Sequence, residues 1–247
     1  MATHFKGPIL FSAQRPALEN LNIARWNDQF IQFDDYDHGA IDETLRWVIV
    51  KDSGASVAVV ADARSGEVNL NSTATTENDG ASLQGHEEYF SLPSTAGNKL
   101  YYETRIKTSD VDQMDILVGL TETFATNPEN ALASANIIGF LLADGSAVIS
   151  GVTESGGTAT TVTFADTTKS TLADDTFVTL GFKATKGTST DTVRFYINRQ
   201  EVGVSQTNIP TANLKLAVMS LSGDATGTKV TTLDYVMAAQ DRAVSYE

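Results

Sequence analysis

An alternation of apolar and polar residues, repeated along most of the chain, constrains its fold more than any other feature. In residues 99–107, KLYYETRIK, every second side chain from Leu100 to Ile106 is apolar or small. The same period of two returns in TFVTLGFKA, DTVRFYI, LKLAVM and TTLDYVM. This period is typical of β-strands with one face on a core. The predicted inward residues are Leu100, Tyr102, Ile106, Val178, Leu180, Phe182, Val193, Phe195, Ile197, Leu216 and Val218.

Turn signals separate the predicted strands. Pairs of Gly with Asp or Gly recur at 79–80, 144–145, 156–157 and 223–224, and such pairs mark sharp turns. SVAVVA and NIIGFLL predict short strands buried on both faces. Asn127 and Pro128 predict the start of a helix of one or two turns. Residues 150–170, rich in Thr, Ser and Gly, predict an exposed hairpin and loop. This pattern favours an all-β sandwich over alternating strands and helices.

The first forty or so residues lack this period. Gly7 and Pro8 interrupt the apolar run in MATHFKGPILFS before it reaches the length of a secretory signal. Pro8 and Pro16 are incompatible with a helix interior. We therefore predict an extended N-terminal arm over residues 1–25 and one sandwich domain over residues 26–247. The acidic run FDDYDHGAIDE predicts a charged surface loop at the start of that domain.

Composition excludes several classes of partner and chemistry. Seventeen basic against thirty-one acidic residues give a net charge of -14, which repels phosphate backbones and anionic membranes, so nucleic acid and membrane partners are not expected. No apolar stretch approaches the length of a membrane span. The absence of cysteine removes disulfides, thiolate metal ligands and cysteine nucleophiles. The three histidines, at positions 4, 38 and 86, show no spacing typical of a helical metal pair.

The candidate catalytic and metal motifs are incomplete. DVDQMDILVG resembles an acidic glycosidase strand, but Asp112 and Asp115 fall on opposite faces of a regular strand. TENDGAS and SGDATG contain oxygen ligands suited to calcium without a complete ligand loop. FDDYDHG combines three acids with a histidine, as some metal sites do, and is better explained as a surface loop. No phosphate-binding glycine loop or nucleophile elbow occurs. The prediction is a protein that is not an enzyme and needs no metal or cofactor.

Four consecutive segments carry a family resemblance. KLYYETRIKTSDVDQMDILVGL, NIIGFLLADGS, TFVTLGFKATKGTSTDTVRFYINRQEVG and NLKLAVMSLSGDATGTKVTTLDYVMAAQ resemble the concanavalin A-like (laminin G-like) jelly roll. The resemblance covers about residues 47–239 and implies two antiparallel sheets packed face to face. Its most specific part is VRFYINRQEV followed by the closing TTLDYVMA. Asn198, Arg199, Gln200 and Glu201 replace the short Asp-Gly or Asn-Gly turn of many members, which predicts a longer hairpin tip.

NDGASLQ before the first of these segments, DQMDILVGL within it and the HFKGPILFS lead look like jelly-roll virion proteins of tailed bacteriophages. This resemblance implies a capsid decoration or cement protein, made in the host cytoplasm and located on the virion surface. Its implied partners are the major capsid protein and neighbouring virion subunits, and a homo-oligomer on the capsid is compatible with it. The arm would dock on such a neighbour through Phe5, Pro8, Ile9, Leu10 and Phe11.

Two further function classes stay open beside the scaffold. The alternative is a lectin-like module that binds surface glycans, on a phage tail or fibre, and the third is a glycan-cleaving enzyme. A lectin needs an exposed aromatic platform, for which Tyr36, Tyr101 and Tyr196 are the candidates, although aromatic residues on strand faces often pack locally. The fold alone does not choose among these classes.

Overall fold

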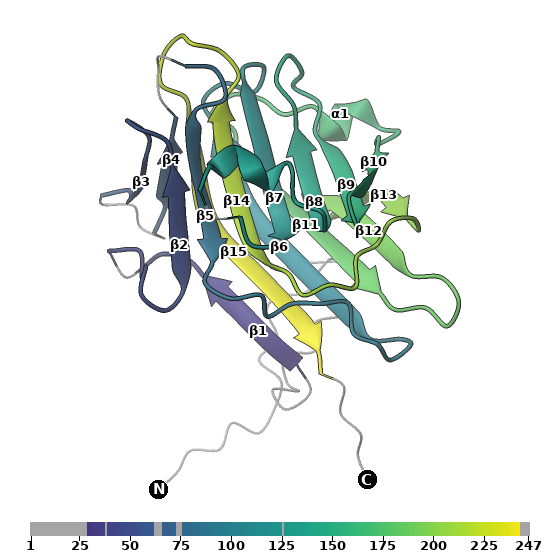
Figure 1. Cartoon of the computed structure of the whole chain (residues 1–247). Helices are drawn as coiled ribbons and strands as arrows, with labels where there is room; N and C mark the ends of the chain where they lie inside the picture. Colours follow the sequence, from purple (N-terminus) through teal and green to yellow (C-terminus); the bar gives the residue numbers. More distant parts are fainter. Residues whose placement is uncertain (1–28, 38, 62–65, 73–75, 125, 243–247) are drawn as a thin grey trace, which may run out of the picture.

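The computed structural model describes residues 29–37, 39–61, 66–72, 76–124 and 126–242. In this part of the chain two antiparallel sheets pack face to face (Figure 1). The eight-stranded sheet contains, in spatial order, β13 (Gln200–Ser205), β12 (Thr192–Ile197), β11 (Val178–Thr185), β6 (Lys99–Thr108), β15 (Val230–Asp241), β4 (Val68–Asn71) and β3 (Ser56–Val59), with β1 (Gln29–Asp34) also paired to β15. The seven-stranded sheet contains β10 (Thr158–Val162), β9 (Ser150–Ser155), β8 (Ile137–Leu142), β7 (Met114–Thr121), β14 (Lys215–Ser222), β5 (Gly80–Gly85) and β2 (Trp47–Lys51). The all-β sandwich prediction is confirmed.

The period of two determines which side chains form the core between the sheets. All eleven predicted inward residues are buried and belong to one hydrophobic cluster. Antiparallel register places Phe182 of β11 between Tyr102 of β6 and Phe195 of β12. The rings of Tyr102 and Phe182 stack with centroids 5.2 Å apart. Phe195 reaches across the sandwich to Phe140 of β8, at 5.4 Å and edge to face.

Three local predictions were wrong in part. SVAVVA forms β3, whose residues are half-buried or exposed because it is the edge strand beyond β4. The acidic run is not entirely a surface loop, since Asp34 and Tyr36 are buried. In the segment expected to be exposed, β10 is exposed as predicted, but Thr153 and Phe164 lie in the interior.

The predicted helix start forms a single 3-10 turn, η1 (Pro128–Ala131). The Asn127 side chain caps it by accepting a hydrogen bond from the backbone N–H of Glu129, at 3.0 Å. A second short helix, α1 (Thr167–Ser170), is capped in the same way by Asp166. Neither short helix, nor any other helix within the described residues, is long and apolar enough to cross a membrane.

The β12–β13 hairpin corrects the expectation of a longer tip. Ile197 pairs directly with Gln200, so the turn contains two residues, Asn198 and Arg199. Both have positive φ, 47° and 67°, as a type I′ turn requires. Asn198 tolerates this conformation and also accepts a hydrogen bond from the N–H of Thr179 at 3.0 Å. The sequence signal was hidden because arginine occupies the second position, where glycine is usual.

Candidate functional site

A groove of about 700 Å³ lies at the end of the sandwich where β15 finishes. It is formed by the segment after Phe90, the residue after β11, one residue of the β13–β14 loop and the last residues before position 243. Its volume falls in the range of small-ligand sites. The lining residues are Ser91, Leu92, Pro93, Ser94, Lys186, Thr211, Gln240, Asp241 and Arg242.

Hydrogen bonds fix the walls of this groove. The Gln240 side chain accepts from the N–H of Ser91 at 2.8 Å and donates to the carbonyl of Tyr89 at 3.1 Å. The Asp241 carboxylate accepts from the N–H of Lys99 at 2.9 Å. Lys186 is held by an ion pair with Asp191 at 2.9 Å. The loop between Phe90 and β6 is therefore held against the end of β15.

The accessible groups in the groove are suited to hydrogen bonding with hydroxyl-rich ligands. Leu92 and Pro93 are buried and give it apolar surface, whereas Ser94, Thr211 and Arg242 are exposed. These three offer two hydroxyl groups and a guanidinium, which together donate and accept hydrogen bonds. The combination of apolar surface with a few polar groups is typical of a ligand site.

An exposed aromatic side chain stands beside the groove. Tyr89 is 51% exposed, and its ring contacts that of Phe30 with centroids 5.6 Å apart. The three tyrosines that were candidates for an exposed aromatic platform for glycans do not form one, because Tyr36, Tyr101 and Tyr196 are all buried. No motif distinguishes Tyr89 in the sequence. Its exposure follows from its position in the short segment that joins β5 to β6.

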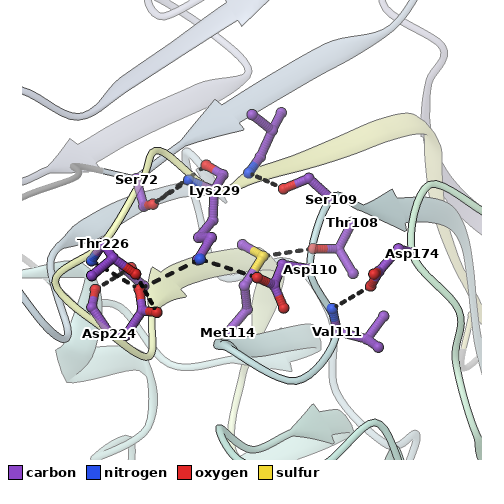
Figure 2. Close-up of polar contacts among 12 residues, drawn as sticks. Ser72, Thr108, Ser109, Asp110, Val111, Met114, Asp174, Asp224, Thr226 and Lys229 are labelled. Atoms are coloured by element: carbon purple, nitrogen blue, oxygen red, sulfur yellow. Dashed lines mark hydrogen bonds and ion pairs between the residues drawn. The ribbon is translucent and has the colours of Figure 1, made fainter.

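A second polar cluster occupies the opposite end of the sandwich, around Lys229 (Figure 2). The Lys229 ammonium lies 3.0 Å from a carboxylate oxygen of Asp110 and 3.5 Å from one of Asp224. The backbone N–H of Lys229 donates to the Ser72 hydroxyl at 3.0 Å. Asp224 also accepts from the N–H and hydroxyl of Thr226, at 3.1 and 2.7 Å. These contacts join the loops before β5, after β6 and before β15.

The charges of Lys229 and Asp224 indicate that this cluster stabilises the fold. Burial alone would lower the pKa of Lys229, but its contacts with Asp110 and Asp224 outweigh burial and hold that pKa above its ordinary value. Hydrogen bonds from Thr226 lower the pKa of Asp224. The charged form of Lys229 therefore stabilises the fold until pH rises through its raised pKa. The charged form of Asp224 stabilises the fold until pH falls through its lowered pKa.

We therefore expect Lys229→Met to lower the midpoint of urea unfolding at pH 7, where both charges are present. The difference from the original chain should shrink at about pH 2 and about pH 12, because Asp224 is then protonated or Lys229 is then neutral, and the original chain loses the ion pairs that the variant lacks at every pH. Urea titrations at the three pH values measure this. Lys169→Met is the matched control, since Lys169 pairs with Asp166 on the surface and exposed pairs contribute little. An equal difference at all three pH values would contradict the assignment.

Asp112 and Asp115 of the acidic glycosidase-like segment differ in their backbone setting and in their hydrogen-bond partners. Asp112 precedes β7, so strand alternation does not apply to it, and its carbonyl accepts from the N–H of Gly145 at 2.9 Å. Asp115 lies on β7 and accepts from the backbone N–H of Asp144 at 3.0 Å. The pKa of Asp115 is raised above its ordinary value, because burial and the nearby charge of Asp144 outweigh the hydrogen bond from the Asp144 backbone. This pair lies at the opposite end from the groove.

The outer face of the seven-stranded sheet is occupied by the chain itself. Phe124 and Ala131 pack with Leu117, Ala217 and Met219 in a second apolar cluster. In Figure 1 the helical turn η1 lies in front of β14. The Gln84 side chain on β5 donates to the carbonyl of Phe124 at 2.6 Å and fixes this segment. The middle of this face is therefore closed.

The other sites predicted from sequence are the docking residues of the N-terminal arm and the candidate metal sites. Phe5, Pro8, Ile9, Leu10 and Phe11 lie outside the described residues. Within the described residues, no group of three or more His, Asp or Glu side chains is arranged to hold a metal ion. The calcium candidate SGDATG forms the Asp224 turn described above. The expectation that the protein needs no metal stays a prediction.

Comparisons with known proteins identify the fold. No family model matches the sequence, and no curated protein matches it. Solved structures do match. An endo-1,3-beta-glucanase from Streptomyces sioyaensis is 11% identical with a TM-score of 0.62, over 86% of this chain and 96% of that one. Peanut lectin is 9% identical with a TM-score of 0.58, over 88% and 100% of the two chains.

A third similar structure is arcelin-5, a lectin-like defense protein from Phaseolus vulgaris. It is 4% identical with a TM-score of 0.57, over 87% of this chain and 100% of that one. At these identities the likeness concerns the fold, which both hydrolases and lectins share, and it assigns no activity. The chain therefore has the concanavalin A-like jelly-roll fold that its strand pattern and segment order predict.

Proposed function

We propose that this protein is a lectin-like module that binds glycans in the groove at the end of β15. The observation that carries the proposal is the groove itself, with exposed Ser94, Thr211 and Arg242 around buried Leu92 and Pro93. Sugar hydroxyls need such donors and acceptors, and the apolar face of a sugar ring packs on aromatic rings such as the half-exposed Tyr89. Lectins among the similar structures support this proposal over the capsid scaffold.

Binding fits the groove better than cleavage does. Most glycosidases use two carboxyl groups on either side of the bond that breaks. Among the residues described as lining the groove, Asp241 is the one carboxylate, and it accepts a backbone hydrogen bond from Lys99. A reducing-sugar assay on any glycan that binds tests this point. Release of reducing ends would show that the protein is a hydrolase.

The test of binding is a glycan array followed by titration calorimetry on the ligands found. We expect Thr211→Trp to weaken binding about tenfold or more, because the indole would fill the groove from an exposed position without altering the core. Thr228→Trp is the matched control, at an exposed threonine in the β14–β15 loop at the opposite end. Equal affinity in the two variants would place the ligand elsewhere.

The capsid decoration role implied by the sequence resemblance stays a second prediction. It concerns location and partners, namely the virion surface, the major capsid protein and neighbouring subunits. Copurification of the chain with intact capsids would support this role. Its absence from particles would leave glycan binding as the function to pursue.

A further inference from the structure

A buried patch lies on the outer face of the eight-stranded sheet. We call it the outer patch and define it by Tyr101 and Glu103 of β6, Tyr196 of β12, and Met237 and Ala239 of β15. These residues alternate with inward core residues along their strands, so their side chains point away from the core. They are nevertheless only 0–9% exposed. A sheet face in contact with water normally exposes such positions.

Described residues supply little apolar surface to this patch. Within that part of the chain, Ile31 of β1 is the partly buried apolar side chain that packs against Tyr101, Met237 and Ala239. Two residues further along the same face of β1, Phe33 is 49% exposed. The apolar surface of the outer patch therefore extends beyond what β1 covers.

Glu103 gives a second and independent sign of an occupant. One oxygen of its carboxylate accepts from the Tyr235 hydroxyl at 2.7 Å. The other oxygen is buried and has no hydrogen-bond partner among the described residues. A buried carboxylate oxygen without a donor is unfavourable, and such atoms are rare in folded proteins. The occupant of the patch is therefore expected to bring a cation or another donor as well as apolar groups.

We propose that residues 1–28 of the same chain dock on the outer patch. Gln29, the first residue of β1, pairs with Asp241, and Ile31 pairs with Ala239, so the preceding chain enters at the border of the patch. An extended chain rises about 3.3 Å per residue and neighbouring strands lie about 4.8 Å apart, so this segment is long enough to cross several strands. The two prolines of the segment favour that extended form.

The composition of the segment matches both requirements of the patch. Phe5, Ile9, Leu10 and Phe11 offer apolar side chains. Lys6, Arg15 and Arg25 offer cations able to donate to the free oxygen of Glu103. This assignment places the arm on its own domain, whereas the sequence resemblance implies a neighbouring virion subunit.

Methionine oxidation in the full-length chain tests the proposal. Met237 lies in the outer patch, whereas Met114 and Met219 are fully buried and report on the sandwich itself. In a variant with Phe5, Ile9, Leu10 and Phe11 all changed to serine, hydrogen peroxide should oxidise Met237 about tenfold faster, with Met114 and Met219 unchanged. Peptide mass spectrometry measures the three rates. Leu45→Ser is the control at an apolar residue that is 75% exposed and lies outside the outer patch, and it should change none of them.

Two results would overturn the proposal. An unchanged Met237 rate in the four-serine variant would show that these apolar residues do not cover the patch. Faster oxidation of all three methionines would show that they belong to the sandwich core. Sedimentation of the original chain then separates own-chain docking from exchange between copies. A monomer is expected, and an oligomer that dissociates in the variant would assign the occupant to a second copy.

Discussion

Replacing Phe195 with alanine should destabilise the protein by about 3–5 kcal/mol, the range for a buried phenylalanine. Phe195 is fully buried and packs against three other rings. The distances between ring centroids are 5.4 Å to Phe140, 5.9 Å to Phe164 and 6.4 Å to Phe182. It is thus shared by both sheets and by the segment after β10. The cavity would collapse poorly, because β12 is hydrogen-bonded to β11 and to β13.

Urea unfolding followed by circular dichroism measures this loss. Phe33→Ala removes the same side chain from an exposed site on β1 and should change stability by less than about 1 kcal/mol. A loss below about 2 kcal/mol for Phe195→Ala would mean that the aromatic cluster repacks around the missing ring. It would also mean that the two sheets are joined mainly through other contacts.

Strands whose sequence alternates apolar with polar or small residues were predictable, whereas β1, which lacks this alternation, was not. The inward set from Leu100 to Val218 emerged from periodicity alone, because burial on one face imposes a period of two. The strand β1 escaped detection because its inward face carries Phe30 and Asp34, whereas its outward face carries Ile31 and Phe33. No alternation of apolar with polar residues survives such an arrangement.

The candidate site could not be predicted from local sequence. Its lining comes from four separate stretches, which are brought together only when β15 pairs with β6 and the loop before β6 packs against its end. None of these stretches has a spacing that signals chemistry. The same holds for Tyr89, whose exposure depends on the loop around it. A binding role for the fold was foreseen as the alternative, but the location of the groove required the structure.

Replacing Asp34 with alanine is expected to destabilise the protein by about 2–4 kcal/mol, because two buried donors would lose their acceptor. The Trp47 indole N–H donates to one Asp34 oxygen at 2.7 Å, and the N–H of Tyr36 donates to the other at 2.9 Å. Asp34 ends β1 on one sheet, and Trp47 begins β2 on the other. The carboxylate therefore links the sheets within the core.

Variants at the same site separate this hydrogen bonding from charge. Asp34→Asn keeps one carbonyl oxygen and should lose about half as much stability as alanine, whereas Arg46→Ala should lose less than about 1 kcal/mol. Arg46 lies 3.6 Å from Asp34 and is 48% exposed, so its charge is largely screened by solvent. Urea unfolding followed by tryptophan fluorescence measures all three, with Trp47 as a reporter. If Arg46→Ala proved as damaging as Asp34→Ala, the ion pair rather than the indole hydrogen bond would hold the two sheets together here.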